Sequence, residues 1–380
     1  MITDLSAKET FSELSKTIEE ISAWGYAELA AHLPKDRVPI GYFCPFVPEE
    51  LLYAAQAFPV RLMGFPVKIS HAQAHLPSYC CHLVKSSLES LLRGELTFLK
   101  GIIFSQTCDS MKGLSDIWAL EKRSHFQFNL MVPSRLDGEL PRLFFREEIK
   151  RLTEFLGREV NPVTAENLSR SIHLFNQVRA GLGECYRRFR SDSPLLTNKL
   201  LAQIIQVGFF IDRADYLGLL QNLLRAIPEA GDDGKRTPLY LTGNMTHSPD
   251  WLALLDEAGA VVVGDDLCSG GRTLRLMTDE TGDPWNGLID RYFRTFFCPT
   301  KYMGPWGRRE ILLKEVQESG AKGVIFLFYK FCEPHYFDYP DVRHWLESQG
   351  IPTLLLDIEG PSQGREQLKI RIQAFMEMLA

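Results

Sequence analysis

Several features that mark membrane, secreted or nucleic-acid-binding proteins are missing from this sequence of 380 residues. No apolar run reaches the roughly 18 residues that a membrane-spanning helix needs. The first residues lack the basic start and the apolar core of a signal peptide. The net charge is −6, with both signs interspersed, so no basic field favours nucleic acid. We therefore expect a cytoplasmic protein that binds neither membrane nor nucleic acid.

Common cofactor motifs are also missing. The eight cysteines contain no CxxC pair, which argues against zinc ribbons and thioredoxin-like sites. No GxxxxGK[ST] phosphate loop is present, and the glycines at Gly243, Gly270 and Gly271 do not match GxGxxG. Disulfides are uncommon in the cytoplasm. The cysteines therefore need another explanation, as buried small hydrophobes, redox thiols or metal ligands.

Short apolar strands alternate with helices in two parts of the chain. The first part covers 38–133, after an amphipathic helical lead over 1–35, and the second begins at 238. Helical patterns dominate 145–230. Strand–helix alternation favours parallel sheets with covering helices. We predict an α/β protein with an N-terminal domain at 1–150, a helical connector at 151–230 and a C-terminal domain at 231–380.

Most cysteines lie where ligands bind in parallel sheets, just beyond the strands. Cys44, Cys108, Cys268 and Cys332 follow predicted strands, Cys81 lies near a helix start, and Cys298 lies in a polar stretch. One such cysteine would be a core residue, but six favour convergent ligands. Thiolates bind iron–sulfur clusters or zinc, and the pattern favours iron–sulfur. We interpret Cys185 as structural, and only one of Cys80 and Cys81 as a ligand.

Seven segments carry a resemblance to a known family. They are GYFCPFVPEELLYAA, SYCCHLVKSSLESL, SQTCDSMKGLSDIW, VVGDDLCSGGRTL, FFCPTKYM, GVIFLFYKFCEPHYFDYP and the closing IPTLLLDIEG…QLKIRIQAFMEML. Over residues 35–380 the chain resembles the 2-hydroxyacyl-CoA dehydratase superfamily, which includes ATP-dependent benzoyl-CoA reductases and double-cubane cluster proteins. The resemblance implies two Rossmann-like domains joined by a helical linker.

The resemblance also implies a cofactor and partners. A [4Fe–4S] cluster would be held by Cys81, Cys108 and Cys332. A double-cubane [8Fe–9S] cluster would use Cys44, Cys268 and Cys298 as well. A separate ATP-dependent activator would supply low-potential electrons, and the assembly would be a homodimer or a heterodimer with a paralogous subunit.

Three functions follow as alternatives from the resemblance. The first is radical dehydration or reduction of an acyl-CoA by an iron–sulfur subunit. The second is a homodimeric double-cubane protein that reduces small molecules. The third is a non-catalytic electron-transfer partner subunit.

Polar residues near the cysteines are further candidates. Glu49 and Glu50 follow Cys44 and are candidates for orienting substrate or moving a proton, with stabilisation of a helix N-terminus as the alternative. His335 is a candidate proton donor or a structural histidine. The expected cofactor environment, each member with a purely structural alternative, comprises Ser86, Asp109, Arg272 and Lys301.

Overall fold

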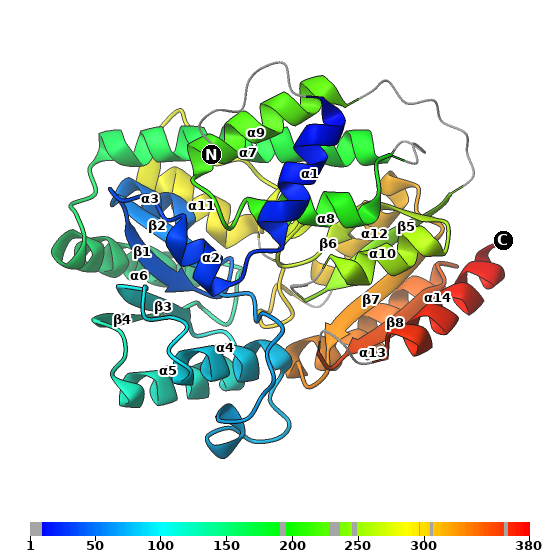
Figure 1. The fold of residues 1–380 in the computed structure, drawn as a ribbon, viewed down its shortest axis with the longest axis horizontal. Helices are drawn as coiled ribbons and strands as arrows, with labels where there is room; N and C mark the ends of the chain where they lie inside the picture. Colours follow the sequence, from blue (N-terminus) through cyan, green and yellow to red (C-terminus); the bar gives the residue numbers. More distant parts are fainter. Residues whose placement is uncertain are drawn as a thin grey trace.

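A computed structural model of the chain contains two four-stranded parallel sheets (Figure 1). It describes residues 10–190, 195–227, 236–244, 249–295, 297–304, 307–360 and 364–380. The strand order is β2-β1-β3-β4 in one sheet and β6-β5-β7-β8 in the other. Each sheet therefore has its first strand in second place, so the same topology is used twice.

The first sheet is formed by β1 (Val38–Tyr42), β2 (Ala57–Arg61), β3 (Gly101–Ser105) and β4 (Phe126–Leu130). All its pairings are parallel, and Tyr42 is the register partner of Arg61 at the carboxyl end of the β1–β2 pair. Helices follow its first three strands and return the chain each time to the start of the next one. They are α3 (Glu49–Ala54), α4 (His82–Leu92) and α5 (Asp109–Glu121).

The second sheet is formed by β5 (Thr237–Gly243), β6 (Ala260–Asp266), β7 (Gly323–Tyr329) and β8 (Thr353–Ile358). Every residue of β6 and β7 is buried, as expected for strands covered on both faces. The helices that belong to this half are α10 (Asp250–Glu257), α12 (Gly307–Ser319), α13 (Glu333–Ser348) and α14 (Arg365–Leu379).

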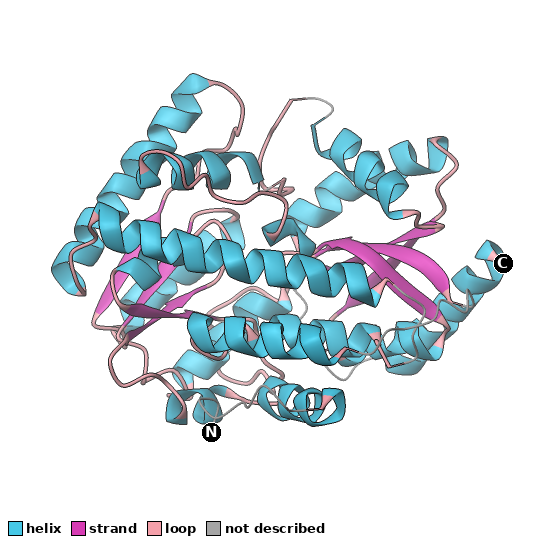
Figure 2. Cartoon of the chain, turned by 90° about the horizontal axis from the view of Figure 1, so that it is seen from above, coloured by secondary structure: helices cyan, strands magenta, loops and turns pink. Residues whose placement is uncertain are grey.

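A helical layer joins the two sheets. It contains α6 (Glu139–Glu159), α7 (Ala165–Phe189), α8 (Asn198–Val207) and α9 (Arg213–Ala226), together with α1 (Phe11–Ser22), α2 (Tyr26–Ala31) and α11 (Pro284–Thr295). The long helix α7 contacts both α3 and β6, and it runs across the molecule in both views (Figures 1 and 2). Although α11 comes from the second half of the sequence, its Leu288 and Ile289 lie in the core beside the first sheet.

The α/β prediction is confirmed, and all eight expected strands are present. Helix α3 is short, because it ends at Ala54 and Gln56 turns the chain with a positive φ of 60°. The lead expected over 1–35 contains two helices, and residues 1–9 lie outside the described ones. The three domain ranges stay a prediction, and the boundary at 150 falls within α6. No helix in the described part of the chain is long and apolar enough to cross a bilayer.

Gly243 ends β5 where the backbone leaves no room for a side chain. Its φ is +154°, and an added Cβ would lie 2.0 Å from the Leu327 carbonyl oxygen. Gly243→Ala should therefore lower the free energy of unfolding by about 2 kcal/mol or more, measured by chemical denaturation. Gly259→Ala is the control, because its φ of +73° is strained but open space surrounds it. The control should lose only about 1 kcal/mol, and equal losses would contradict the close approach.

Candidate functional site

Three of the predicted cysteine ligands occupy the same structural position. Cys81, Cys108 and Cys332 are the N-cap residues of α4, α5 and α13. A helix N-terminus carries partial positive charge and free backbone N–H groups, so it favours a thiolate. Backbone N–H groups of these first turns lower the pKa of each thiol, although burial outweighs them and the pKa of all three is raised.

These three thiols lie near one another, and we call them the Cys81 triad. Burial, followed by the charges of Cys81 and Cys108, raises the pKa of Cys332 well above its usual value. Burial also raises the pKa of Cys108 to about 12, and the charge of Cys81 contributes. The carboxyl ends of β3 and β7, which lead into Cys108 and Cys332, therefore meet.

The other three predicted ligands form a second group, the Cys44 triad of Cys44, Cys268 and Cys298. Burial, followed by the charges of Cys298 and Cys268, raises the pKa of Cys44 to about 12. Cys44 follows β1 and Cys268 follows β6, so thiols from both sheets meet again. Cys298 also raises the pKa of Cys108, which links the two triads. The structure thus gathers all six predicted ligands.

The remaining two cysteines differ from these six. Cys80 is buried and acts on its neighbour Cys81, while Cys185 lies in α7 beside Glu184 and Tyr216. Among the described residues, no three His, Cys, Asp or Glu side chains are close enough to bind a single metal ion. Since each cysteine of a cluster binds a different iron, cluster ligands stand further apart than ligands of one ion.

Cys268 is held by buried charged groups. Arg272 donates from Nη1 to its Sγ at 3.0 Å and is fixed by a two-pronged pair with Asp266. Arg61, at the end of β2, donates from Nη2 to the Cys268 carbonyl oxygen at 2.7 Å. The sequence did not lead us to predict a role for Arg61. A charged residue at the end of an otherwise apolar strand could have indicated one.

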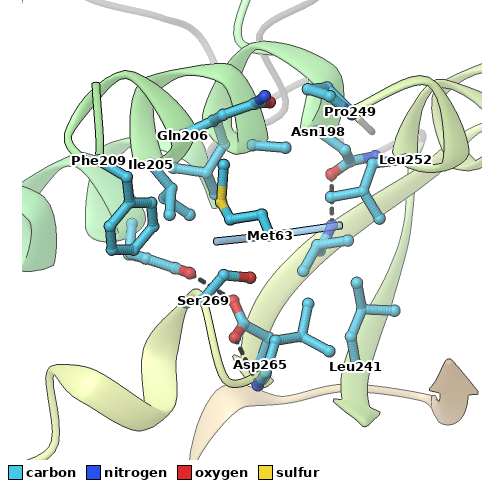
Figure 3. Close-up of a pocket in the computed structure, with 16 residues that line it drawn as sticks. Met63, Asn198, Ile205, Gln206, Phe209, Leu241, Pro249, Leu252, Asp265 and Ser269 are labelled. Atoms are coloured by element: carbon cyan, nitrogen blue, oxygen red, sulfur yellow. Dashed lines mark hydrogen bonds between the residues drawn. The ribbon is translucent and has the colours of Figure 1, made fainter. Parts of the chain in front are cut away.

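The loop that carries Cys268 is wound around a buried carboxylate. Asp265 accepts hydrogen bonds from the N–H groups of Leu267 and Gly271 and from the Tyr186 hydroxyl. A Cβ on Gly270 or Gly271 would collide with Asp265, so these glycines permit the tight turn. Asp265 and Ser269 border a closed, largely apolar cavity of about 30 Å³ (Figure 3), which has room for little more than a water molecule.

A second hydrogen bond to sulfur reaches Cys332. Asn244, just after β5, donates from Nδ2 to its Sγ at 3.0 Å and is itself fixed by accepting from the Tyr329 N–H. His335 lies beside both, with Nδ1 3.0 Å from the Asn244 amide nitrogen. Burial, together with the charges of Arg272 and Arg308, holds the pKa of His335 well below its usual value. His335 is therefore neutral near pH 7, and its proton-donor role stays a prediction.

The other expected cofactor-shell residues divide into two kinds. Lys301 lies near the thiols, because Cys298 and Cys44 both act on its pKa, which burial lowers overall. Asp109 is largely exposed and pairs with Lys112, but its charge contributes to the raised pKa of Cys108. The hydroxyl of Ser86 donates to the His82 carbonyl oxygen within α4, so it is engaged with its own helix.

Glu49 and Glu50 lie in α3 and are bound to arginines of the connector. Glu50 is fully buried and pairs with Arg179, while Tyr292 donates to it at 2.6 Å. Glu49 pairs with Arg213. These contacts fasten the first sheet to α7 and α9, and the catalytic role expected for both carboxylates stays a prediction.

An open cleft of about 760 Å³ is lined in part by His82, which directly follows Cys81, and none of the cysteines is among the described residues of its lining. Lys68 and Lys85 place positive charge in it, and Gly360 closes it from the second half of the chain. Clefts of this size commonly hold small-molecule ligands.

Comparison with known proteins identifies the family. The family model described as 2-hydroxyglutaryl-CoA dehydratase, D-component, matches residues 44–379. The chain belongs to this D-component family. Its matched region begins at Cys44 and includes all six gathered thiols, so the resemblance found in the sequence is confirmed.

Curated relatives of this D-component chain are similar over most of their length. The (R)-phenyllactyl-CoA dehydratase beta subunit of Clostridium sporogenes is 28% identical, with 90% of this chain and 91% of the relative covered. The (R)-2-hydroxyglutaryl-CoA dehydratase beta subunit of Acidaminococcus fermentans is 25% identical, covering 97% and 99%. One of the benzoyl-CoA reductase subunits of Thauera aromatica is 24% identical, covering 84% of each.

The buried ion pair between Glu50 and Arg179 should account for much of the loss of folding stability of this D-component chain at low pH. Despite burial, Arg179, Arg291 and Tyr292 lower the pKa of Glu50 to about 2 from an ordinary 4.5. A depressed pKa contributes stability above pH 4.5 that is lost as the pH falls towards 2. Glu50→Gln should therefore lower the free energy of unfolding by about 3 kcal/mol at pH 7 and flatten its decline between pH 4.5 and 2.

The control for this prediction is Glu166→Gln. Glu166 pairs with Arg170 at the surface, with a side chain 79% exposed, so its loss should change stability little. Denaturation followed at several pH values measures both variants. An unchanged pH profile in Glu50→Gln would show that the buried pair does not carry this stability.

Proposed function

We propose that this chain is the iron–sulfur subunit of an acyl-CoA dehydratase or reductase. The carrying observation is the gathering of six thiols, buried or half-buried, in two linked triads where the carboxyl ends of both sheets meet. The reactions for which the relatives are named, dehydration of 2-hydroxyacyl-CoA thioesters and reduction of benzoyl-CoA, support this choice.

The residues present fit an iron–sulfur cluster. The six thiols would hold it as thiolates, and the raised pKa values of Cys44 and Cys108 mean that binding would release protons. Arg272 and Asn244 already donate hydrogen bonds to two of the sulfurs. Arg61 is buried with Nε and Nη1 unpartnered among the described residues, as expected beside a negatively charged group. When bound, a cluster supplies one-electron chemistry.

The protein's own residues would keep this chemistry dry and in place. The cysteines lie among core side chains, with Cys81 and Cys298 less than a tenth exposed. Neutral His335 and the amide of Asn244 fix the Cys332 side chain without adding charge. We assign the electrons to a separate ATP-dependent activator. Because relatives are named as beta subunits, a paralogous partner subunit is part of this proposal.

The cleft beside Cys81 is our candidate for acyl-CoA. Its volume suits a drug-sized or larger ligand, and Lys68 and Lys85 would attract the phosphates of coenzyme A. Lys85 is held in place, since its Nζ donates to the Ser78 carbonyl oxygen at 2.7 Å. The thioester end would then point towards His82 and the Cys81 triad.

A double-cubane protein is the second candidate function. A single [4Fe–4S] cluster needs only the Cys81 triad, yet the Cys44 triad is equally buried and is linked to it through Cys298 and Cys108. The six-thiol arrangement favours an [8Fe–9S] cluster in a homodimer that reduces small molecules.

Iron and acid-labile sulfide content tests both candidates. After anaerobic reconstitution, we expect about eight irons per chain if both triads act together and about four if only the Cys81 triad binds. Cys108→Ser should remove most of the iron in either case. Cys298→Ser should remove iron only from the larger cluster.

The matched control is Cys185→Ser, because Cys185 is buried in α7 away from the triads. It should keep the wild-type iron content. A wild-type chain that takes up no iron would overturn both cluster-based functions.

Charge reversal in the cleft tests the acyl-CoA proposal. The double variant Lys68→Glu, Lys85→Glu should raise the Kd for coenzyme A at least tenfold at low ionic strength, measured by calorimetry, with less effect at high salt. Lys150→Glu, on α6 outside the cleft, should bind like the wild type. Equal affinity in all three proteins would exclude this cleft as the coenzyme A site.

A further inference from the structure

Arg61 is a buried cation whose charge is not balanced by a carboxylate in the described part of the chain. Its side chain is 2% exposed, and it donates a hydrogen bond to the Cys268 carbonyl oxygen. Nε and Nη1 have no hydrogen-bond partner among the described residues, and the guanidinium lies 4.7 Å from the Phe209 ring centre. A guanidinium cannot shed its charge in a protein, so it needs a nearby anion.

Three other deeply buried arginines have carboxylate partners. Arg213 stacks on the same Phe209 ring, at 5.5 Å, but pairs with Glu49. Arg179 pairs with Glu50, and Arg272 pairs with Asp266.

Arg291 is also buried, and it donates to the carbonyl oxygens of Leu276 and Thr273. Arg61 differs from the three paired arginines, because its hydrogen bond goes to the backbone carbonyl oxygen of Cys268, a predicted cluster ligand.

The nearest groups that can become anions are the thiols of the Cys44 triad. Arg61 donates to the carbonyl oxygen of Cys268 at 2.7 Å, and Arg272 donates to its Sγ at 3.0 Å. Lys301 adds a third cation near Cys298 and Cys44. The Cys81 triad has a different setting, with a neutral amide at Cys332 and the carboxylate of Asp109 near Cys108. Buried arginine charge is therefore concentrated on the Cys44 side, whereas the positive charge near Cys81 is that of Lys85 in the cleft.

We propose that Arg61 is the built-in counter-charge for an anionic iron–sulfur group on the Cys44 triad, acting as a positioning residue that holds the group and raises its reduction potential. This inference rests on the proposed function. Adding one electron makes such a group more negative by one charge, and a fixed cation in a dry site stabilises that reduced form. Arg61 ends a strand of the first sheet and binds Cys268, which follows a strand of the second sheet. It therefore also links the contact between the two sheets to the charge of the cluster.

The test is Arg61→Met in the full-length chain, with and without reconstituted iron. Without iron, the variant should melt at the wild-type temperature or above it, because an unbalanced buried charge has been removed. With iron, it should lose the metal to a ferrous chelator at least tenfold faster. Its reduced-to-oxidised ratio at a fixed potential should fall at least tenfold, which is 59 mV for a one-electron couple. Titration with titanium(III) citrate, followed by electron paramagnetic resonance, measures this shift.

Two further variants separate charge from structure. Arg61→Lys keeps the charge and should recover most of the potential. Arg213→Met removes a buried arginine from the same aromatic ring but leaves Glu49 unpaired. It should lower the melting temperature of the iron-free chain and leave the potential unchanged.

The outcomes distinguish this inference from the proposed function. An iron-free Arg61→Met chain that melts below wild type, with an unmoved potential, would make Arg61 purely structural and overturn the inference alone. A wild-type chain that binds no iron would overturn the proposed function and the inference together.

Discussion

The buried carboxylate of Asp266 organises the end of the second sheet. Arg272, Arg275 and Arg308 all bind it, and their charges hold its pKa well below the usual range despite burial. One carboxylate thus fixes three cations that each reach a different element. Arg272 reaches the sulfur of Cys268, while the other two reach Glu315 and Asp338. The position of Cys268 depends on this network together with Asp265, which its loop is wound around, and Arg61, which binds its carbonyl oxygen.

Burial of charge also explains why the two sheets meet as they do. Glu50 of α3 is bound by Arg179 of α7 and by Tyr292 of α11, so the first sheet is fastened to the connector and to a helix from the second half. Breaking such a pair leaves a charge in a dry site, which is strongly unfavourable. The connector is therefore more than a spacer, because it sets the distance between the strand ends that carry the thiols.

The sequence predicted the strands well and the site in part. Apolar runs such as GVIFLFY identify buried strands, and Cys108 or Cys332 just after such runs could be assigned as a site because parallel strands end at one edge. Arg61 and Asn244 could not be assigned, because their roles depend on how the two sheets face each other. Gly270 and Gly271 match no phosphate-loop motif, and their small size serves the turn around Asp265. Short-range patterns do not contain such contacts.

The cysteine thiols and the guanidinium of Arg61 differ in one chemical respect. Cysteine thiols can give up their charge by taking protons, and burial favours this for Cys44 and Cys108. Arg61 has no such option. In the metal-free chain the thiols are therefore neutral while the arginine stays charged, and the site is unbalanced. Under the proposed function, a negatively charged group bound through thiolates would restore the balance, and the protein interior would then favour the loaded state over the empty one.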